Sequence, residues 1–430
     1  MGVFRGVGIL QIHLSEFDRA LLEGEEGAAA QMAMRILHRM LPVFGVDRFM
    51  DISAAHIDST VYMGVATMEY AERLADLGAK VRVPSTLNVS GVDEHGWKEW
   101  DVPAEVAGNA IRQMKAYESM GCIPTWTCAP YQTEHAPVFG QQIAAGESNV
   151  IGYYNSVIGA RTERYPDLLD ICAAITGRVP AAGLHLDEGR KGTELLRLKD
   201  IPVALQEDDA FYPVLGHLLG RQASDGIPVV QGMEVQPNED QLKAVCAGGA
   251  SAGAIALFHI VGVTPEAPTV EDAFQGDEPP LVKDITMTEM MEAYHELSTS
   301  SGQKLDMVVL GSPHFSINEF KALAPLVAGR RSHEDVEFLV TCSRAVRMIA
   351  EHVGLLDPIR EFGAKITVDT CPLTSPMLPE RIKHLMTNSA KYAYYSPGLL
   401  NVDVTYGRLS DCVESAVSGS IEREEGLWTA

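Results

Sequence analysis

Along much of the chain, a stretch with apolar residues on one helical face ends near a glycine, and a short apolar run and a polar loop follow it. The clearest example begins with helical periodicity over Ala104 to Met120, which Gly121 ends. Ile123 to Thr127 is the apolar run, and Cys128 to Tyr131 form the loop. Glycine is common just after helices, and short apolar runs are typical of buried parallel strands. The pattern therefore predicts alternating helices and strands.

The same order recurs along the chain. Helices are expected over Thr67–Leu77, Tyr165–Thr176, Gln241–Ala252, Thr288–Ser298 and Ser343–Phe362, and strands over Lys80–Val83, toward His185, and over Ala254–Ile260, Met307–Leu310 and Lys365–Val368. This alternation predicts an α/β fold with mainly parallel sheets, in which ligands bind at the carboxyl ends of the strands. The length of 430 residues suits two or three domains, and we expect subdomains at roughly 1–200, 201–300 and 301–430.

Composition narrows the range of partners. The chain has 34 Lys plus Arg against 58 Asp plus Glu, a formal net charge of −24, so neither nucleic acid nor an anionic membrane surface is an expected partner. Seven cysteines without dense, regular spacing favour a reducing cytoplasm, where free thiols are available as metal ligands. We therefore expect a cytoplasmic protein.

One segment has the length of a membrane span. Ala244 to Pro265 contains no Asp, Glu, Lys or Arg, but Gly248, Gly249, Gly253 and His259 dilute its hydrophobicity. A small-residue helix that leads into a buried strand explains the segment better than a membrane helix does.

Two cysteines stand out by their position. Cys128 and Cys371 each follow a threonine, precede a proline within two residues, and come at the carboxyl end of an expected strand. This placement favours metal ligation, although buried cysteines also serve as small hydrophobic residues. Cys172, Cys246, Cys342 and Cys412 lie in helical patterns, where the structural interpretation is favoured. The sequence has no CxxC pair, so a metal site requires ligands from distant loops.

Polar residues in three loops are further candidates. His56 has Asp58 two positions on, which suits a ligand or base oriented by a carboxylate. The loop Gly311 to Ser316 contains Ser312, His314 and Ser316. A third segment contains Asn155, Ser156, Arg161 and Arg164, and either arginine suits a substrate carboxylate. Structural capping and solvated surface are the competing interpretations. Dinucleotide, P-loop and GxSxG motifs are absent.

These residues lie in blocks that resemble the large-subunit part of the aconitase X family, remote relatives of aconitase that dehydrate small hydroxy acids. The blocks extend from about Leu21 to Cys412. They include AHIDST (55–60), GAKVRVPSTLNV (78–89), PTWTCAPY (124–131), GESNVIGYYNSVIGARTERY (146–165), LGSPHFS (310–316), DTCPLTSPM (369–377) and TNSAKYAYYSPG (387–398). The resemblance implies an aconitase-like multi-domain architecture.

The resemblance also implies an iron-sulfur cluster held by Cys128 and Cys371, whose exposed iron acts as a Lewis acid. Archaeal members tend to read Gly-Cys-Pro-His where this chain reads Gly311-Ser312-Pro313-His314. Serine is a poor substitute for a soft thiolate, so His56, Cys122 or a smaller cluster comes into consideration. Whether the cluster is 2Fe-2S, 3Fe-4S or 4Fe-4S stays open at this point.

The same departure favours the bacterial branch, which resembles cis-3-hydroxy-L-proline dehydratases and forms pyrroline-2-carboxylate. On this interpretation Thr86, Asn88, Asn155, Ser156, Arg161 and Ser312 orient the substrate, and His314, Lys391 and Ser316 are the catalytic candidates. The chain length corresponds to the large part of the family alone, which implies a small partner subunit that contributes a catalytic hydroxyl.

Three alternatives stay open. The first is the large subunit of a mevalonate 5-phosphate dehydratase, and the second is a non-catalytic iron-sulfur subunit of a complex. The third is a cluster-free enzyme that uses Ser316, His314 and Asp369 for acid-base work.

Overall fold

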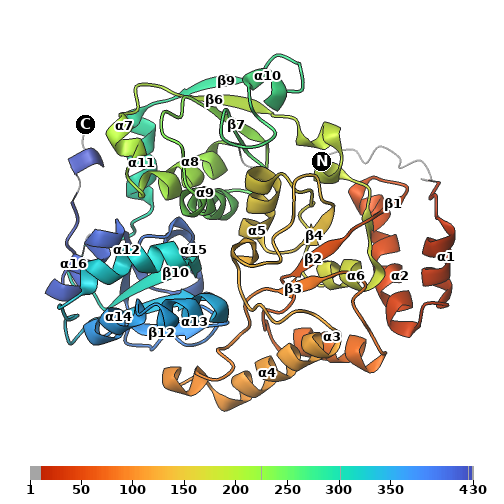
Figure 1. Cartoon of the computed structure of the whole chain (residues 1–430), viewed down its shortest axis with the longest axis horizontal. Coiled ribbons are helices and arrows are strands. Elements are labelled where there is room, and N and C mark those ends of the chain that lie inside the picture. Colours follow the sequence, from red (N-terminus) through yellow and green to blue (C-terminus); the bar gives the residue numbers. More distant parts are fainter. Residues whose placement is uncertain (1–10, 224, 301, 425, 429–430) are drawn as a thin grey trace, which may run out of the picture.

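In the computed structural model, which describes residues 11–223, 225–300, 302–424 and 426–428, the chain forms three successive α/β units (Figure 1). The first unit has a parallel three-stranded sheet of order β3-β2-β4 and a separate antiparallel pair, β1 with β5. Its strands are β1 (Phe49–Asp51), β2 (Ala54–Ile57), β3 (Ser85–Leu87), β4 (Ile143–Ala145) and β5 (Arg178–Pro180). Its helices are α1 (Glu16–Glu23), α2 (Ala28–Phe44), α3 (Val65–Asp76), α4 (Ala104–Ser119), α5 (Ser148–Tyr153) and α6 (Leu169–Thr176).

The second unit has a parallel four-stranded sheet of order β8-β7-β6-β9. Its strands are β6 (Glu194–Leu198), β7 (Pro228–Gln231), β8 (His259–Ile260) and β9 (Val282–Ile285). Its helices are α7 (Val203–Gln206), α8 (Phe211–Ala223), α9 (Glu239–Ala252), α10 (Val270–Ala273) and α11 (Met287–Glu296). In Figure 1 this unit lies above the third unit, and α9 lies next to α5 of the first.

The third unit has a parallel five-stranded sheet of order β12-β11-β10-β13-β14. Its strands are β10 (Met307–Phe315), β11 (Glu337–Cys342), β12 (Lys365–Val368), β13 (His384–Thr387) and β14 (Asp403–Tyr406). Its helices are α12 (Ile317–Val327), α13 (Arg344–His352), α14 (Leu356–Phe362), α15 (Ala390–Leu400) and α16 (Leu409–Ser418). The strand order reverses direction between β10 and β13, and the carboxyl ends at such a reversal are where open α/β sheets bind ligands.

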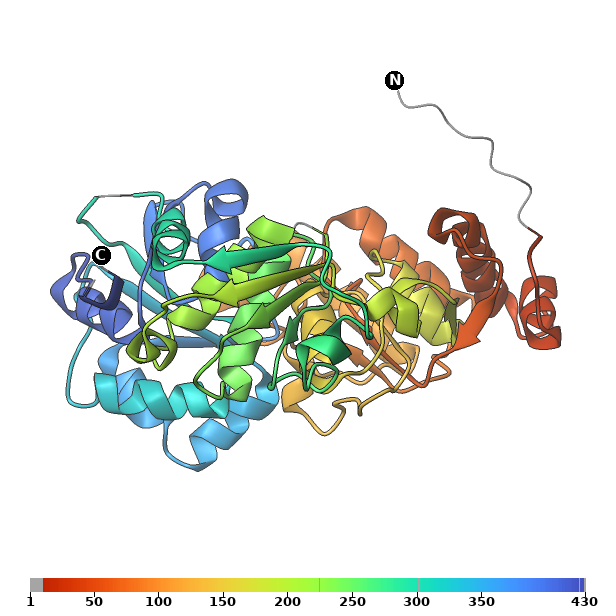
Figure 2. The same ribbon diagram turned by 90° about the horizontal axis from the view of Figure 1, so that it is seen from above.

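The apolar core is shared unequally among the units. The first unit has a core of its own, which includes Leu37 and Ile171. One continuous cluster joins all three units, with Trp100, Leu215 and Tyr406 among its members. Figure 2 shows α1 and α2 at one end of the molecule and the third unit at the other. The predicted α/β architecture with parallel sheets is confirmed.

Helix ends follow the sequence pattern more closely than strand ends do. Gly78, Gly121 and Gly177 follow their helices with positive φ, as predicted. The strand expected over Lys80–Val83 forms instead at β3, and Ile123–Thr127 makes only a bridge to β3. The helix expected over Ser343–Phe362 is two helices, α13 and α14, and β10 continues through the segment predicted to be a loop.

The uncharged segment Ala244–Pro265 forms most of α9, a loop and β8. Its glycines allow α9 to approach α8 closely: a Cβ on Gly248 would lie 2.6 Å from the Pro213 carbonyl oxygen, and one on Gly216 would lie 2.3 Å from that of Val245. Helix packing therefore explains the small residues. Across the described part of the chain, no helix is both long and apolar enough to span a membrane.

Candidate active site between the first and third units

A cavity of about 650 Å³ lies between the first and third units. Both cysteines singled out from the sequence line it. Cys128 comes from the first unit and Cys371 follows β12 of the third, and each is 7% exposed. Other polar side chains that line it are Asp58, Asn88, Glu147, Arg164, Asp167, Ser312 and Lys391. The cavity therefore combines two thiols with charges of both signs.

The loop that carries Cys128 is held against β3. The Thr127 N–H donates to the Leu87 carbonyl at 3.1 Å, and the Thr125 hydroxyl donates to the same carbonyl at 2.8 Å. Trp126 between them is fully buried with a φ of 44°, a left-handed conformation that is uncommon outside glycine. The backbone bends here, and Cys128 comes to line the cavity.

The loop that carries Cys371 is held by hydrogen bonds from the Arg344 guanidinium. Asp369, with a φ of 66°, accepts two hydrogen bonds of 2.6 Å from the Arg344 guanidinium at the start of α13. The same guanidinium donates to Glu94 of the first unit at 2.7 Å. Bidentate contacts of this kind fix geometry as well as charge. The Cys371 loop is thereby tied to both units.

His314 joins the two cysteine loops. Its Nε2 donates to the Thr370 carbonyl at 3.3 Å, its Nδ1 accepts from the Thr127 hydroxyl at 3.0 Å, and its backbone N–H donates to the Cys128 Sγ at 3.3 Å. Burial lowers the pKa of His314 to about 4, so the ring is neutral. Because both ring nitrogens are occupied and the side chain does not line the cavity, the structure gives His314 a positioning role rather than the predicted catalytic one.

Lys391 and Glu147 form an ion pair of 2.5 Å at the cavity wall, with side chains 15% and 6% exposed. Burial alone would lower the pKa of Lys391, but the charges of Glu147 and Cys128 raise it above its ordinary value. Lys391 is therefore a proton-bearing ammonium. Burial raises the pKa of the Cys128 thiol to about 12, while the neighbouring Lys391 acts in the opposite direction.

Other predicted site residues divide into those at the cavity and those behind it. Asn88 and Ser312 line the cavity, as predicted. Thr86 lies behind it and hydrogen-bonds to the His56 Nδ1 at 2.9 Å. His56 is fully buried, and burial lowers its pKa to about 3. Neither Thr86 nor His56 reaches the cavity, because β2 and β3 point both side chains into the interior.

Ser316 is also removed from the cavity. It caps the start of α12: its hydroxyl accepts from the Glu319 N–H at 3.1 Å and donates to Asp240 at 2.7 Å. Those contacts explain the residue structurally. The catalytic role predicted for Ser316 therefore has no support from its position.

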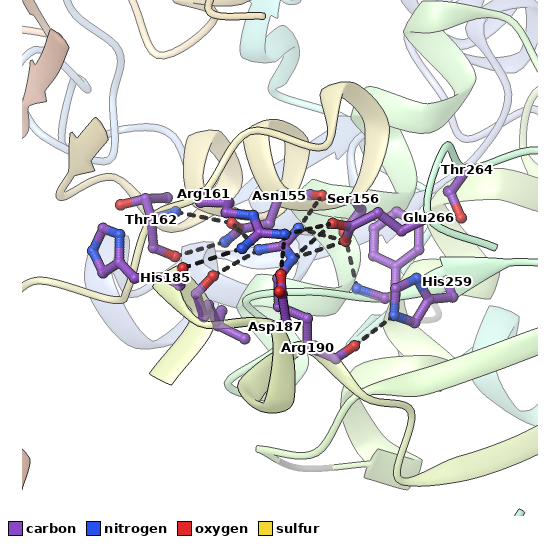
Figure 3. Close-up of polar contacts among 12 residues, drawn as sticks. Asn155, Ser156, Arg161, Thr162, His185, Asp187, Arg190, His259, Thr264 and Glu266 are labelled. Carbon is purple, nitrogen blue, oxygen red and sulfur yellow. Dashed lines mark hydrogen bonds and ion pairs between the residues drawn. The ribbon is translucent and has the colours of Figure 1, made fainter. Parts of the chain in front are cut away.

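Asn155, Ser156 and Arg161 belong to a different cluster, shown in Figure 3, where the first unit meets the second. Arg161 pairs with Asp187 and lies 3.9 Å from Glu266. The Asn155 amide donates to backbone carbonyls at 2.9 and 3.0 Å, and the Ser156 hydroxyl accepts from the Phe258 N–H at 2.9 Å. These side chains are already occupied in joining the two units. Their predicted role in substrate binding is corrected accordingly.

Sequence reasoning missed the acidic residues of the cavity. The sequence suggests Asp58 only as a partner for His56 and Glu147 only as a member of a polar cluster, and it gives no sign of Asp167. Arg164 was considered beside Arg161, and it is Arg164 that lines the cavity. These positions are three residues apart, and the loop that carries them has no periodicity to show which one faces inward.

The donor set at the cavity suits a metal cluster held by two thiols. Cys122 does not line the cavity, and no group of three His, Cys, Asp or Glu side chains with metal-binding geometry occurs among the residues that the structure describes. The Ser312 hydroxyl lines the same cavity as the thiols. A soft two-thiol site with a nearby hydroxyl fits an iron-sulfur group.

Fold and site together define an α/β protein of three parallel-sheet domains with a two-thiol cavity between the first and the third. Comparison with known proteins gives its family. Models for the first, second and third domains of aconitase X match residues 11–188, 192–296 and 305–418. The chain belongs to the aconitase X family, which confirms the resemblance drawn from the sequence blocks.

Individual relatives are of two kinds. The chain is 45% identical to the cis-3-hydroxy-L-proline dehydratase of Pseudomonas aeruginosa over 94% of its own length and 70% of that protein. It is 35% identical to the phosphomevalonate dehydratase large subunit of Methanothermobacter thermautotrophicus, over 93% of this chain and 97% of that one. The crystal structure of Thermococcus kodakaraensis aconitase X in its holo-form matches with a TM-score of 0.82 at 29% identity, over 94% of this chain and all of that one.

Proposed function

We propose that the chain is an iron-sulfur-dependent hydro-lyase that dehydrates cis-3-hydroxy-L-proline to pyrroline-2-carboxylate. The observation that carries the proposal is the meeting of the Cys128 and Cys371 thiols in one charged cavity. Sequence identity supports the choice of substrate, since it is 45% and 43% to two hydroxyproline dehydratases and 29–35% to the phosphomevalonate dehydratase large subunits.

Cys128 and Cys371 would hold the cluster, and Ser312 lines the same cavity. When bound, such a cluster supplies a Lewis-acidic iron for the carboxylate and hydroxyl of the substrate. The two thiols come from different domains, so the site requires the first and third domains to be correctly docked. His314 supports that docking through its contacts with both loops.

In this reaction the C3–hydroxyl bond and the Cα–H bond of the substrate break, one water leaves, and the resulting enamine tautomerises to the cyclic imine. Arg164 suits the substrate carboxylate because it lines the cavity with its guanidinium available. Lys391 bears a proton at Nζ, so it fits donation to the leaving hydroxyl better than abstraction from Cα.

We also propose a small partner subunit that closes the cavity and contributes the group that removes the Cα proton. The chain has the length of the phosphomevalonate dehydratase large subunits, and it covers 70% of the Pseudomonas hydroxyproline dehydratase. Two apolar side chains at the cavity, Met63 and Leu399, are 72% and 62% exposed, which suits a surface covered by another chain.

A mevalonate 5-phosphate dehydratase large subunit is the second candidate, because the chain covers 97% of the Methanothermobacter subunit at 35% identity. The cavity lining counts against it. Its acidic side chains Asp58 and Asp167, which make no ion pair with a described cation, would repel a phosphate dianion.

The test is to purify the chain anaerobically, with and without a co-expressed small subunit, and to measure iron, sulfide, visible absorption and product formation. Cys128→Ala and Cys371→Ala should each lose the absorption and at least a hundredfold in activity, while Cys412→Ala, a buried cysteine in α16, should retain both. A Cys371→Ala protein that keeps full iron and full activity would overturn the proposal. Iron and sulfide without turnover of either substrate, even with the small subunit, would favour a non-catalytic iron-sulfur subunit.

A further inference from the structure

The cavity is also lined by two carboxyl groups, those of Asp58 and Asp167, to which the proposed function gives no role. Asp58 follows β2, and Asp167 lies just before α6. Both side chains line the cavity. Neither makes an ion pair with a cation among the described residues, although Lys391 and Arg164 line the same cavity.

The surroundings hold Asp58 in place. Its backbone N–H donates to the Asp170 carboxylate at 2.6 Å, and its Oδ1 accepts a hydrogen bond from the Asn88 amide. Asp170 is itself fixed, since it accepts from the Ser59 N–H at 3.1 Å. The Asn88 amide therefore occupies one oxygen of Asp58. The other oxygen can interact with Asp167 or with a ligand in the cavity.

Negative charge is concentrated at this point. Burial, followed by the charges of Asp167, Glu147 and Asp170, raises the pKa of Asp58 well above its ordinary value. Partial desolvation also raises the pKa of Asp167. Carboxyl groups held together in this way attract a cation strongly, because a bound cation relieves their mutual repulsion.

A guanidinium without a partner provides the opposite charge. Arg164 is exposed at the cavity, and its side chain makes no hydrogen bond or ion pair with the residues described here. Only its backbone is engaged, through an N–H that donates to Glu163 at 2.8 Å. In contrast, the nearby Arg161 is paired with Asp187. Among the described residues that line the cavity, Arg164 is therefore a cation without an acidic partner, and Asp58 and Asp167 are acidic side chains without a cation.

We propose that Asp58 and Asp167 bind the ring ammonium of the substrate while Arg164 binds its carboxylate, so that the site selects zwitterionic hydroxy acids. A secondary ammonium has two N–H donors, which two adjacent carboxyl groups can accept as charge-assisted hydrogen bonds. The same pair rejects substrates that present an anion there. This inference rests on the proposed function and deepens it, because it identifies the residues that set the substrate class.

The discriminating probes are L-proline and cyclopentanecarboxylate, which have the same ring size and carboxylate and differ in the ring nitrogen. Calorimetric binding to the iron-loaded protein, together with its small subunit where one is required, gives a ratio of the two dissociation constants. Hydrogen bonds to charged groups predict a preference for L-proline of about tenfold to a hundredfold in the wild type. Asp167→Asn should bring the ratio close to one.

Three further variants separate recognition from folding. Asp167→Glu keeps the charge and should restore most of the preference. Asp403→Asn, an exposed aspartate at the start of β14, is the matched control and should leave the ratio unchanged. Arg164→Gln should weaken both ligands by a similar factor of about ten, because both carry the carboxylate.

The two possible failures are distinguishable. An unchanged ratio in Asp167→Asn, in a protein that dehydrates cis-3-hydroxy-L-proline normally, overturns the role of the acidic pair and leaves the proposed function standing. A wild-type protein that prefers L-proline but does not dehydrate the hydroxyproline overturns the proposed reaction and leaves the zwitterion site standing. Asp167 is exposed, so its substitution should not prevent folding.

Discussion

His185 makes a contribution to the stability of the first domain that acid should remove. The ring is 1% exposed, and its Nε2 accepts from the Tyr165 hydroxyl while its Nδ1 donates to Gln142, both at 2.6 Å. Burial, followed by the charges of Arg190 and Arg161, lowers the pKa of His185 from 6.5 to about 3. Folding therefore holds this imidazole neutral at pH values where the unfolded chain would protonate it.

The sign and size of the effect follow from proton linkage. Between pH 6.5 and pH 3 the unfolded state binds the proton and the folded state does not, so stability falls as the pH falls through this range. At pH 5 the unfolded state gains about 2 kcal/mol relative to pH 8, since each pH unit below an unfolded pKa of about 6.5 contributes about 1.4 kcal/mol. His185→Gln removes the titration and keeps one donor and one acceptor.

The assay is urea unfolding at pH 8 and pH 5, followed by tryptophan fluorescence. The sequence has four tryptophans, and Trp97, Trp100 and Trp126 lie in the first domain. We expect the wild type to be the more stable protein at pH 8, and its advantage over His185→Gln to shrink by about 2 kcal/mol at pH 5. His95→Gln, which removes a histidine from the surface, is the control. A wild-type advantage that is equal or larger at pH 5 would refute the reasoning.

Other substitutions test the contacts that build the cavity. Glu147→Gln leaves the Lys391 ammonium buried without its partner and should cost about 3–5 kcal/mol in urea unfolding; a Glu147→Gln/Lys391→Met double variant that is no more stable than the single one would contradict this account. His314→Leu leaves two buried polar partners unsatisfied, which should cost about 2–6 kcal/mol and lower the iron bound per chain, with His314→Gln intermediate in both measurements. Gly311→Ala should destabilise by about 3 kcal/mol or more in the same assay, because φ is 95° there and the new Cβ would lie 2.1 Å from the Thr341 carbonyl oxygen; unchanged stability would show that β10 can shift.

The helices could be predicted from the sequence because their signals are local. Periodicity and a terminal glycine marked α4 to within one residue and located α3 and α6. The predicted positions of strands were wrong more often than those of helices. β3 is only three residues long and buried throughout, so its sequence has no alternation to show where it begins. The pairing of β3 with β2, a tertiary contact, decides that Ser85–Leu87 forms the strand in place of Lys80–Val83.

The residues of the site also differ in how far they could be predicted from local sequence. Cys128, Cys371, Asn88 and Ser312 are chemistry-bearing residues in polar loops, whereas Lys391 came from the family resemblance, and all five line the cavity. Such residues can be predicted because parallel α/β sheets gather their loops at one edge. Which of two polar neighbours faces inward is a different question, since it depends on packing against another domain.

Contacts between the first and third domains hold the two cysteine loops at the same cavity. The Ser90 N–H donates to the Asp369 carbonyl at 2.6 Å, Trp100 Nε1 donates to the Thr367 hydroxyl at 2.8 Å, and Arg344 joins Glu94 to Asp369. Buried, directional contacts of this kind define one arrangement and penalise others. The folded chain itself therefore brings the two thiols to one cavity. Exclusion of water during dehydration then falls to a chain that covers the mouth of the cavity, which is the part we assign to the proposed small subunit.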